Sequence, residues 1–145
     1  MILYTMGFTQ KSARDFFETI KDNRVGLLID VRLNNQSQLA GFTKGKDLEY
    51  FLWKIAGCRY VHELLYAPTK ELLDDYKSKK IDWNTYTVIF NELIEKRDMA
   101  GHFGKKYLQE ENALLLCSEP LPDMCHRRLV AEAIEKKYGV ELKHL

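Results

Sequence analysis

The chain has 145 residues, 46% hydrophobic and 30% charged, with a formal net charge of +1; we expect one domain over residues 1–145 with its own core. The near-neutral charge excludes nucleic-acid binding through bulk positive charge, though not through a local basic patch. No apolar run reaches the roughly 18 residues of a membrane span and no signal-peptide pattern is seen, so we expect a cytoplasmic protein without membrane contact. In that compartment the three cysteines are expected to form no disulfide framework.

Apolar runs and helical stripes alternate along the chain. Strands are predicted, in chain order, at residues 2–5, 25–31, 59–64, 113–118 and 140–145. Helices are predicted at residues 13–20, 48–55, 68–79 and 83–94, with a last helix that Asp123 caps and Gly139 ends. Residues 32–45 are predicted to form a loop, and residues 102–107 a turn or a broken helix. The alternation predicts an α/β three-layer sandwich, in which a mostly parallel sheet of about five strands carries helices on both faces.

Polar groups follow several of these strands. Ligands bind outside the carboxyl ends of parallel strands, so we expect the groups that follow each strand to share one rim of the sheet. They are Thr5 and Gly7, then Asp30 and Arg32, then His62 and Glu63, and finally Cys117, Glu119, Cys125, His126 and Arg127. The last group is the densest in reactive side chains, and we expect the chemistry of the protein there.

Three short sequence blocks can be compared with known families: Tyr4-Thr-Met-Gly7, Asp30-Val-Arg32, and Leu116-Cys-Ser-Glu119 followed by Cys125-His126-Arg127. In the order and spacing of these blocks the chain resembles the uncharacterised family called domain of unknown function 488, over nearly its whole length. The resemblance implies a compact α/β domain but no established activity. Family members commonly carry a histidine directly after the early glycine, where this chain has Phe8. The site residues that the resemblance implies are Gly7, Asp30, Arg32, Cys117, Glu119, Cys125, His126 and Arg127.

The two late cysteines have alternative interpretations. Cys125 is predicted in the first turn of a helix, where the helix dipole and the neighbouring arginines would lower its pKa and make it a nucleophile or a metal ligand. It can equally be a small buried residue that packs against the sheet. Cys117 lies within an apolar run, and for it the packing role is favoured over a catalytic one.

His126 and Glu119 are the predicted proton carriers. An imidazole exchanges protons near neutral pH, and Glu119 precedes a turn bordered by prolines. The alternative for His126 is a hydrogen bond to Glu119 or Asp30. Asp30 and Glu119 together could divide the acid and base roles of glycosidic bond cleavage, but pairing of Asp30 with an arginine fits the sequence equally well.

Arg32 and Arg127 are predicted to bind an anion, because a guanidinium offers a bidentate fork to phosphate or carboxylate. The alternative is an internal salt bridge from Asp30 or Glu119 to Arg127. Cys117, Cys125 and His126, with His62 as a distant fourth residue, could also assemble a metal site. Their spacing is not that of a structural zinc site, so no metal or other cofactor is predicted.

The loop at residues 32–45 is rich in amides and also holds Phe42 and Lys44, which suits recognition of a base or sugar. The first functional hypothesis is therefore an enzyme that acts on a phosphate-bearing or nucleoside-like substrate, by N-glycosidic, transferase or thiol chemistry. The second is a non-catalytic module that binds a nucleotide or a short nucleic-acid segment. The third is a redox- or metal-responsive protein that uses Cys117 and Cys125. The sequence indicates no oligomeric state.

Overall fold

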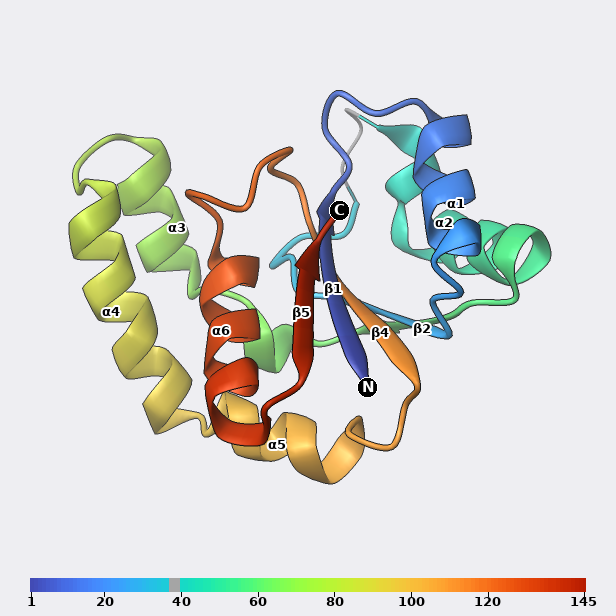
Figure 1. Cartoon of the computed structure of the whole chain (residues 1–145). Helices are drawn as coiled ribbons and strands as arrows, with labels where there is room; N and C mark the ends of the chain where they lie inside the picture. The colour runs from blue at the N-terminus through green and yellow to red at the C-terminus, as the bar shows by residue number, and fades with distance from the viewer. Residues whose placement is uncertain (37–39) are drawn as a thin grey trace.

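A five-stranded parallel β-sheet with helices on both faces forms the centre of the molecule (Figure 1). A computed structural model describes residues 1–36 and 40–145. The order of the strands across the sheet is β3-β2-β4-β1-β5, which confirms the predicted α/β architecture. The strands are β1 (Ile2–Gly7), β2 (Leu27–Asp30), β3 (Arg59–His62), β4 (Asn112–Cys117) and β5 (Glu141–His144).

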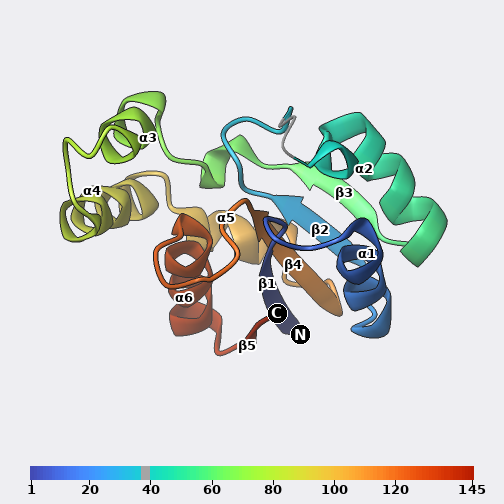
Figure 2. The same cartoon turned by 90° about the horizontal axis from the view of Figure 1, so that it is seen from above.

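The helices form two layers that enclose the sheet (Figure 2). On one face lie α1 (Ala13–Asp22) and α2 (Gly45–Phe51), which continues as a π-helical turn to Ala56. On the other lie α3 (Lys70–Lys77), α4 (Trp83–Lys96), α5 (Met99–Lys106) and α6 (His126–Tyr138). Side chains alternate along each strand, so Leu114 and Leu116 of β4 pack in the core beneath α1, whereas Leu115 and Cys117 pack beneath α6. None of the helices in the described part of the chain is long and apolar enough to cross a membrane.

The topology favours a site at the carboxyl ends of β2 and β4. The chain leaves β2 toward β3 through α2 on one face, and leaves β4 toward β5 through α6 on the other. Connections that leave adjacent parallel strands in opposite directions open a crevice at that edge. The pairing register sets Asp30 beside Leu116 and Gly7 beside Cys117. The polar groups that follow β1, β2 and β4 therefore share one rim, as predicted.

Several predicted boundaries differ from the structure by a few residues, and two of the differences have a clear structural reason. Residues 99–106 form the continuous helix α5 rather than a turn, because its glycines provide close packing instead of a break: a Cβ on Gly104 would collide with the Tyr138 side chain. The last helix begins at His126 and not after Asp123. A turn closed by the bond from Cys125 N–H to the Pro122 carbonyl precedes it, and Cys125, in an extended conformation, is the N-cap residue.

Candidate active site

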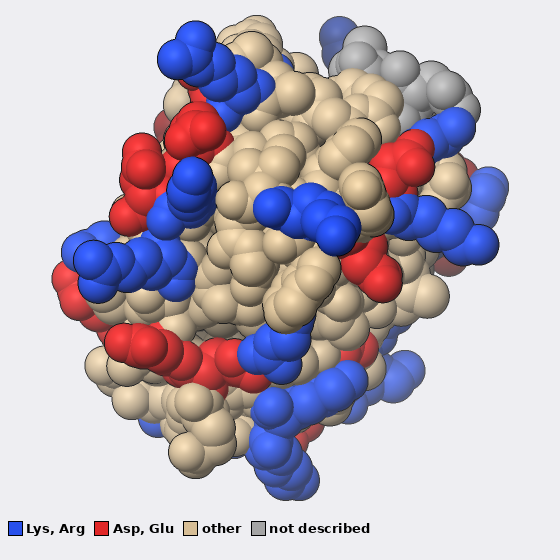
Figure 3. Space-filling view, turned by 90° about the vertical axis from the view of Figure 1, so that its right-hand side faces the viewer, with Lys and Arg blue, Asp and Glu red and all other residues tan. Residues whose placement is uncertain are grey.

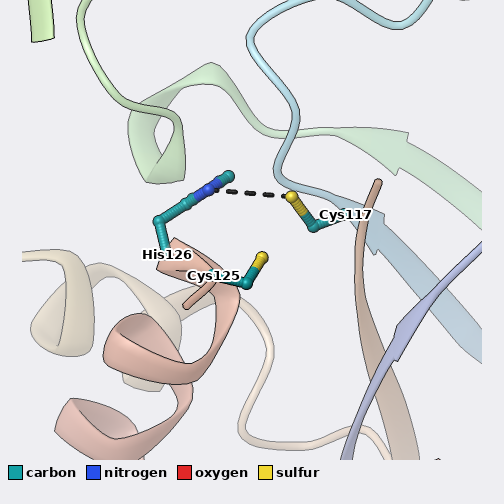
Figure 4. Close-up of side chains that lie close together, drawn as sticks. All are labelled: Cys117, Cys125 and His126. Carbon is teal, nitrogen blue, oxygen red and sulfur yellow. Dashed lines mark hydrogen bonds between the residues drawn. The ribbon is translucent and has the colours of Figure 1, made fainter. Parts of the chain in front are cut away.

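Three reactive side chains converge between the end of β4 and the start of α6. Cys117 is the last residue of β4, Cys125 is the N-cap of α6, and His126 is its first residue. Figure 4 shows the Cys117 sulfur facing the His126 ring, with the Cys125 sulfur beside them. The two sulfurs and a ring nitrogen all lie within 4.8 Å of one another, and all three residues are buried. The fold thus forms a closed thiol–imidazole cluster from residues 117–126.

A backbone carbonyl fixes the orientation of the His126 ring. His126 Nε2 lies 2.7 Å from the Val31 carbonyl oxygen. A carbonyl can only accept, so Nε2 carries a proton and donates it there. Nδ1 then faces Cys117 Sγ at 3.7 Å, in position to accept a hydrogen bond from the thiol. Val31 is itself held by the bond from its N–H to the Leu116 carbonyl, so the sheet determines the tautomer.

The two thiols have opposite electrostatic environments. Interaction with the neighbouring Cys125 thiol holds the pKa of Cys117 below its ordinary value; backbone N–H groups of Ser118 and Glu119 and the charge of Arg127 act in the same direction. The same interaction and burial raise the pKa of Cys125 well above its ordinary value. The sequence-based expectation of a lowered pKa for Cys125 is therefore wrong, because its partner and its burial outweigh the start of the helix.

Arg127 is fully buried and only partly hydrogen-bonded. Its Nη1 donates to the Glu119 backbone carbonyl at 2.5 Å, while Nε and Nη2 have no hydrogen-bond partner among the described residues. Its positive charge contributes, after burial, to lowering the pKa values of Lys11 and His144. Arg127 therefore places a positive charge with two open donors inside the fold.

Gly7 allows the loop after β4 to reach Arg127. A Cβ at Gly7 would lie 1.6 Å from the Glu119 carbonyl oxygen, so a larger residue would push away the carbonyl that Arg127 binds. Ser118 is held on the other side by the backbone N–H and the hydroxyl of Thr9. Glu119 is exposed, and its carboxylate forms no hydrogen bond or ion pair with another described residue.

Asp30 and Arg32 form a buried ion pair with each other. Arg32 Nε and Nη2 donate to the two Asp30 carboxylate oxygens at 2.8 and 2.7 Å, and Nη2 also reaches the Thr43 carbonyl. Tyr60 donates its hydroxyl to Asp30 at 2.8 Å, and the Phe8 ring covers the Arg32 guanidinium at 5.0 Å. The internal pairing considered for Asp30 thus goes to Arg32, and Arg127 is left without a carboxylate.

The remaining candidates lie away from the cluster. His62 Nε2 lies 2.6 Å from the Arg32 carbonyl oxygen and is not part of the Cys117–Cys125–His126 cluster. In the predicted recognition loop, Asn35 donates to the Tyr60 hydroxyl at 3.0 Å. Ser37 and Gln38 of that loop lie outside the described residues.

Two hollows lie elsewhere on the surface. One, of about 480 Å³, borders β3 and includes Trp53 and Tyr60; the other, of about 300 Å³, lies between α1 and α2 and includes Phe17 and Phe51. Figure 3 shows the side of the molecule that carries α1 and α2, where basic and acidic side chains are interspersed. Neither hollow is lined by the thiol–imidazole cluster, whose three residues are buried.

Two groups that shape the site, the Val31 carbonyl and the Tyr60 side chain, are hard to identify from the sequence. The Val31 carbonyl orients His126, yet every residue has a carbonyl, so only the tertiary fold singles it out. Tyr60 completes the shell around Asp30, and its pKa is raised by burial and by the charge of that carboxylate. The sequence indicated only that Tyr60 lies in a predicted strand; the structure shows that this strand pairs with β2, which ends at Asp30.

Comparison with known protein families places the chain in one of them. The model of the family described as Domain of unknown function DUF488 matches residues 12–134, which is most of the chain and includes the whole cluster. No curated protein and no solved structure matches the chain.

Proposed function

We propose that this chain, which belongs to the family Domain of unknown function DUF488, is an enzyme that removes a phosphoryl group from a phosphate-bearing substrate through a covalent intermediate on Cys117. The proposal depends on the buried Arg127 guanidinium, in which two nitrogens have no hydrogen-bond partner among the described residues. Arg127 directly follows His126, which forms the thiol–imidazole pair with Cys117. A guanidinium fork matches two oxygens of a phosphate group, and a buried fork binds them more strongly than one in water.

A bound anion would pair with the buried positive charge of Arg127. A buried charge is costly unless it is paired, and no acidic side chain in the described part of the chain pairs with this one. Arg32, the other predicted anion ligand, is already neutralised by Asp30. Arg127 is thus the better anchor for a substrate phosphate, and Arg32 serves as structural support behind the site.

Cys117 is the better nucleophile because it contacts the base. A thiol, an imidazole and a group that orients the imidazole are the parts of an activated nucleophile. Here they are Cys117, His126 Nδ1 at 3.7 Å, and the Val31 carbonyl. The distance is somewhat long for a strong hydrogen bond, as is common before substrate binds.

The proposed reaction has two steps. First, His126 takes the Cys117 proton, the sulfur attacks phosphorus, and the bond from phosphorus to the ester oxygen breaks as that oxygen takes a proton from a water molecule that the Glu119 carboxylate orients. Second, the resulting hydroxide attacks the phosphocysteine, and the released thiolate recovers its proton from His126. Inorganic phosphate and the free alcohol are the products, and the enzyme returns to its first state.

Thiol chemistry fits the described contacts better than glycosidic chemistry. The Asp30 carboxylate accepts hydrogen bonds from the Arg32 backbone, the Arg32 side chain and Tyr60. It therefore has little capacity left to act as a nucleophile or base toward a sugar. A nucleoside attached to the phosphate would be recognised by the loop after β2, where Asn34 and Gln36 are exposed.

Because the three residues of the cluster are buried, we infer that substrate enters when the loop that joins β4 to α6 moves. The segment from Pro120 to Met124 carries two exposed apolar side chains, those of Leu121 and Met124. Among the described residues, its side chains make one hydrogen bond to the rest of the fold, a long one from the Tyr76 hydroxyl to the Met124 sulfur at 3.9 Å. This weak attachment supports a loop that moves.

The first test measures phosphate release from p-nitrophenyl phosphate and from the 5′-mononucleotides. The second measures the mass of the acid-quenched protein by intact mass spectrometry. Wild-type protein should gain the mass of one phosphoryl group on Cys117, and Cys117→Ser should abolish turnover. The control Cys58→Ser, which changes a buried thiol outside the cluster, should behave as wild type. Turnover that survives in Cys117→Ser would refute the proposal, and phosphate binding without turnover of any probe would favour the non-catalytic binding module.

A further inference from the structure

The same three side chains have the chemistry and the geometry of a metal site, and we infer that Cys117, Cys125 and His126 bind one Zn²⁺ ion. This inference stands on the ligand geometry and does not rest on the proposed function. Cys117 comes from the end of β4 and the other two from the start of α6, so the ion would join two elements of the fold (Figure 4).

The separation of the ligand atoms fits tetrahedral zinc. With Zn–S near 2.3 Å and Zn–N near 2.0 Å, a tetrahedron places sulfur and nitrogen about 3.5 Å apart and two sulfurs about 3.8 Å apart. The Cys117 Sγ to His126 Nδ1 distance is 3.7 Å, and all three atoms lie within 4.8 Å of one another. Small rotations of the side chains are enough to complete the site.

The His126 ring is already arranged as a ligand. A metal-bound histidine usually donates its second ring N–H to a carbonyl or carboxylate, which fixes the ring and directs the other nitrogen at the ion. The bond from His126 Nε2 to the Val31 carbonyl has this arrangement and turns Nδ1 toward the two sulfurs. The orientation exists without the ion, so binding requires little reorganisation of the ring.

The ligand set selects the class of metal. Thiolates and imidazole suit Zn²⁺ and exclude Mg²⁺ and Ca²⁺, which take oxygen ligands. Two thiolates neutralise the divalent charge, which matters beside the buried Arg127 cation. Three protein ligands leave a fourth position for water or a ligand oxygen, since His62 binds the Arg32 carbonyl instead. Zinc and the proposed phosphoryl transfer would compete for Cys117, so the ion would inhibit that reaction.

The test uses metal-free, reduced protein and its variants. Zn²⁺ titrated by calorimetry should bind one ion per chain, with release of protons from the two thiols. Cys117→Ser and Cys125→Ser should each weaken binding at least 10-fold, and the matched control Cys58→Ser should not. Each variant is checked for folding by circular dichroism.

A second measurement needs no variant. Co²⁺ added to the wild-type protein should give a sulfur-to-cobalt charge-transfer band and the intense visible absorption of a tetrahedral ion, and Zn²⁺ should displace both. Absence of this spectrum, or zinc affinity that Cys117→Ser and Cys125→Ser leave unchanged, would overturn the inference. Neither result depends on turnover, so the metal site and the proposed reaction can fail separately.

Discussion

Replacing Arg127 by methionine separates an anion-binding role from a structural role. The two unpaired nitrogens of Arg127 each cost about 1–3 kcal/mol, and the bond from Nη1 to the Glu119 carbonyl returns about 1.5–3 kcal/mol. Methionine fills a similar volume without charge. In the absence of anions, Arg127→Met should therefore raise the free energy of unfolding by roughly 1–3 kcal/mol, or the melting temperature by roughly 3–10 °C.

Phosphate should offset most or all of this difference. Phosphate at 100 times its dissociation constant should stabilise the wild-type protein by about 2.7 kcal/mol and leave Arg127→Met unchanged. Calorimetric melting with and without phosphate measures both effects. The control Arg128→Met removes a partly exposed arginine whose one unsatisfied nitrogen, Nε, lies 3.8 Å from Glu132; its stability should change by less than about 1 kcal/mol, and phosphate should stabilise it as much as the wild-type protein. Loss of several kcal/mol in Arg127→Met, with phosphate stabilising both proteins equally, would refute the reasoning.

Three further predictions concern the support of the site. Asp30→Asn leaves Arg32 buried without its anion and should lower the free energy of unfolding in urea by about 3–5 kcal/mol; a loss below about 1 kcal/mol would contradict the ion pair. Burial raises the pKa of Cys58 from 9.0 to about 12, so the unfolded chain loses this proton at a lower pH than the folded protein, and the free energy of unfolding falls as pH rises from 9 to 12. In Cys58→Ala this fall should be smaller by up to about 4 kcal/mol, and equal slopes in both proteins would count against the prediction. Gly7→Ala forces its Cβ against the Glu119 carbonyl and should lower thermal stability by about 1–3 kcal/mol, whereas an unchanged melting temperature would show that the loop is not held there.

The sequence indicated the architecture and the rim on which the site lies. Continuous apolar runs such as residues 25–31 are typical of strands covered on both faces, and helical stripes lie between them. Parallel strands end at one edge, so the polar groups after the strands were expected on one rim, and the register of β2, β4 and β1 confirms it; the order of the strands was not predictable.

The pairing of side chains within that rim was not predictable. Asp30 could have paired with either arginine, and it pairs with Arg32 because a bidentate fork two residues away closes easily in the turn after β2. The direction of each thiol's pKa shift depends on the groups that surround each sulfur in the fold, which sequence spacing does not reveal. The start of α6 depends on the extended backbone of Cys125 rather than on a capping side chain, so Asp123 was a misleading signal.

The central claim is that Arg127 holds an oxyanion beside Cys117, and the most direct measurement is a crystal structure of the wild-type protein grown with phosphate. Phosphate bound to Arg127 Nε and Nη2, with its phosphorus within reach of the Cys117 sulfur, is the predicted result. Phosphate found only on surface lysines, with the Arg127 donors turned to a carboxylate of the chain itself, would contradict the account.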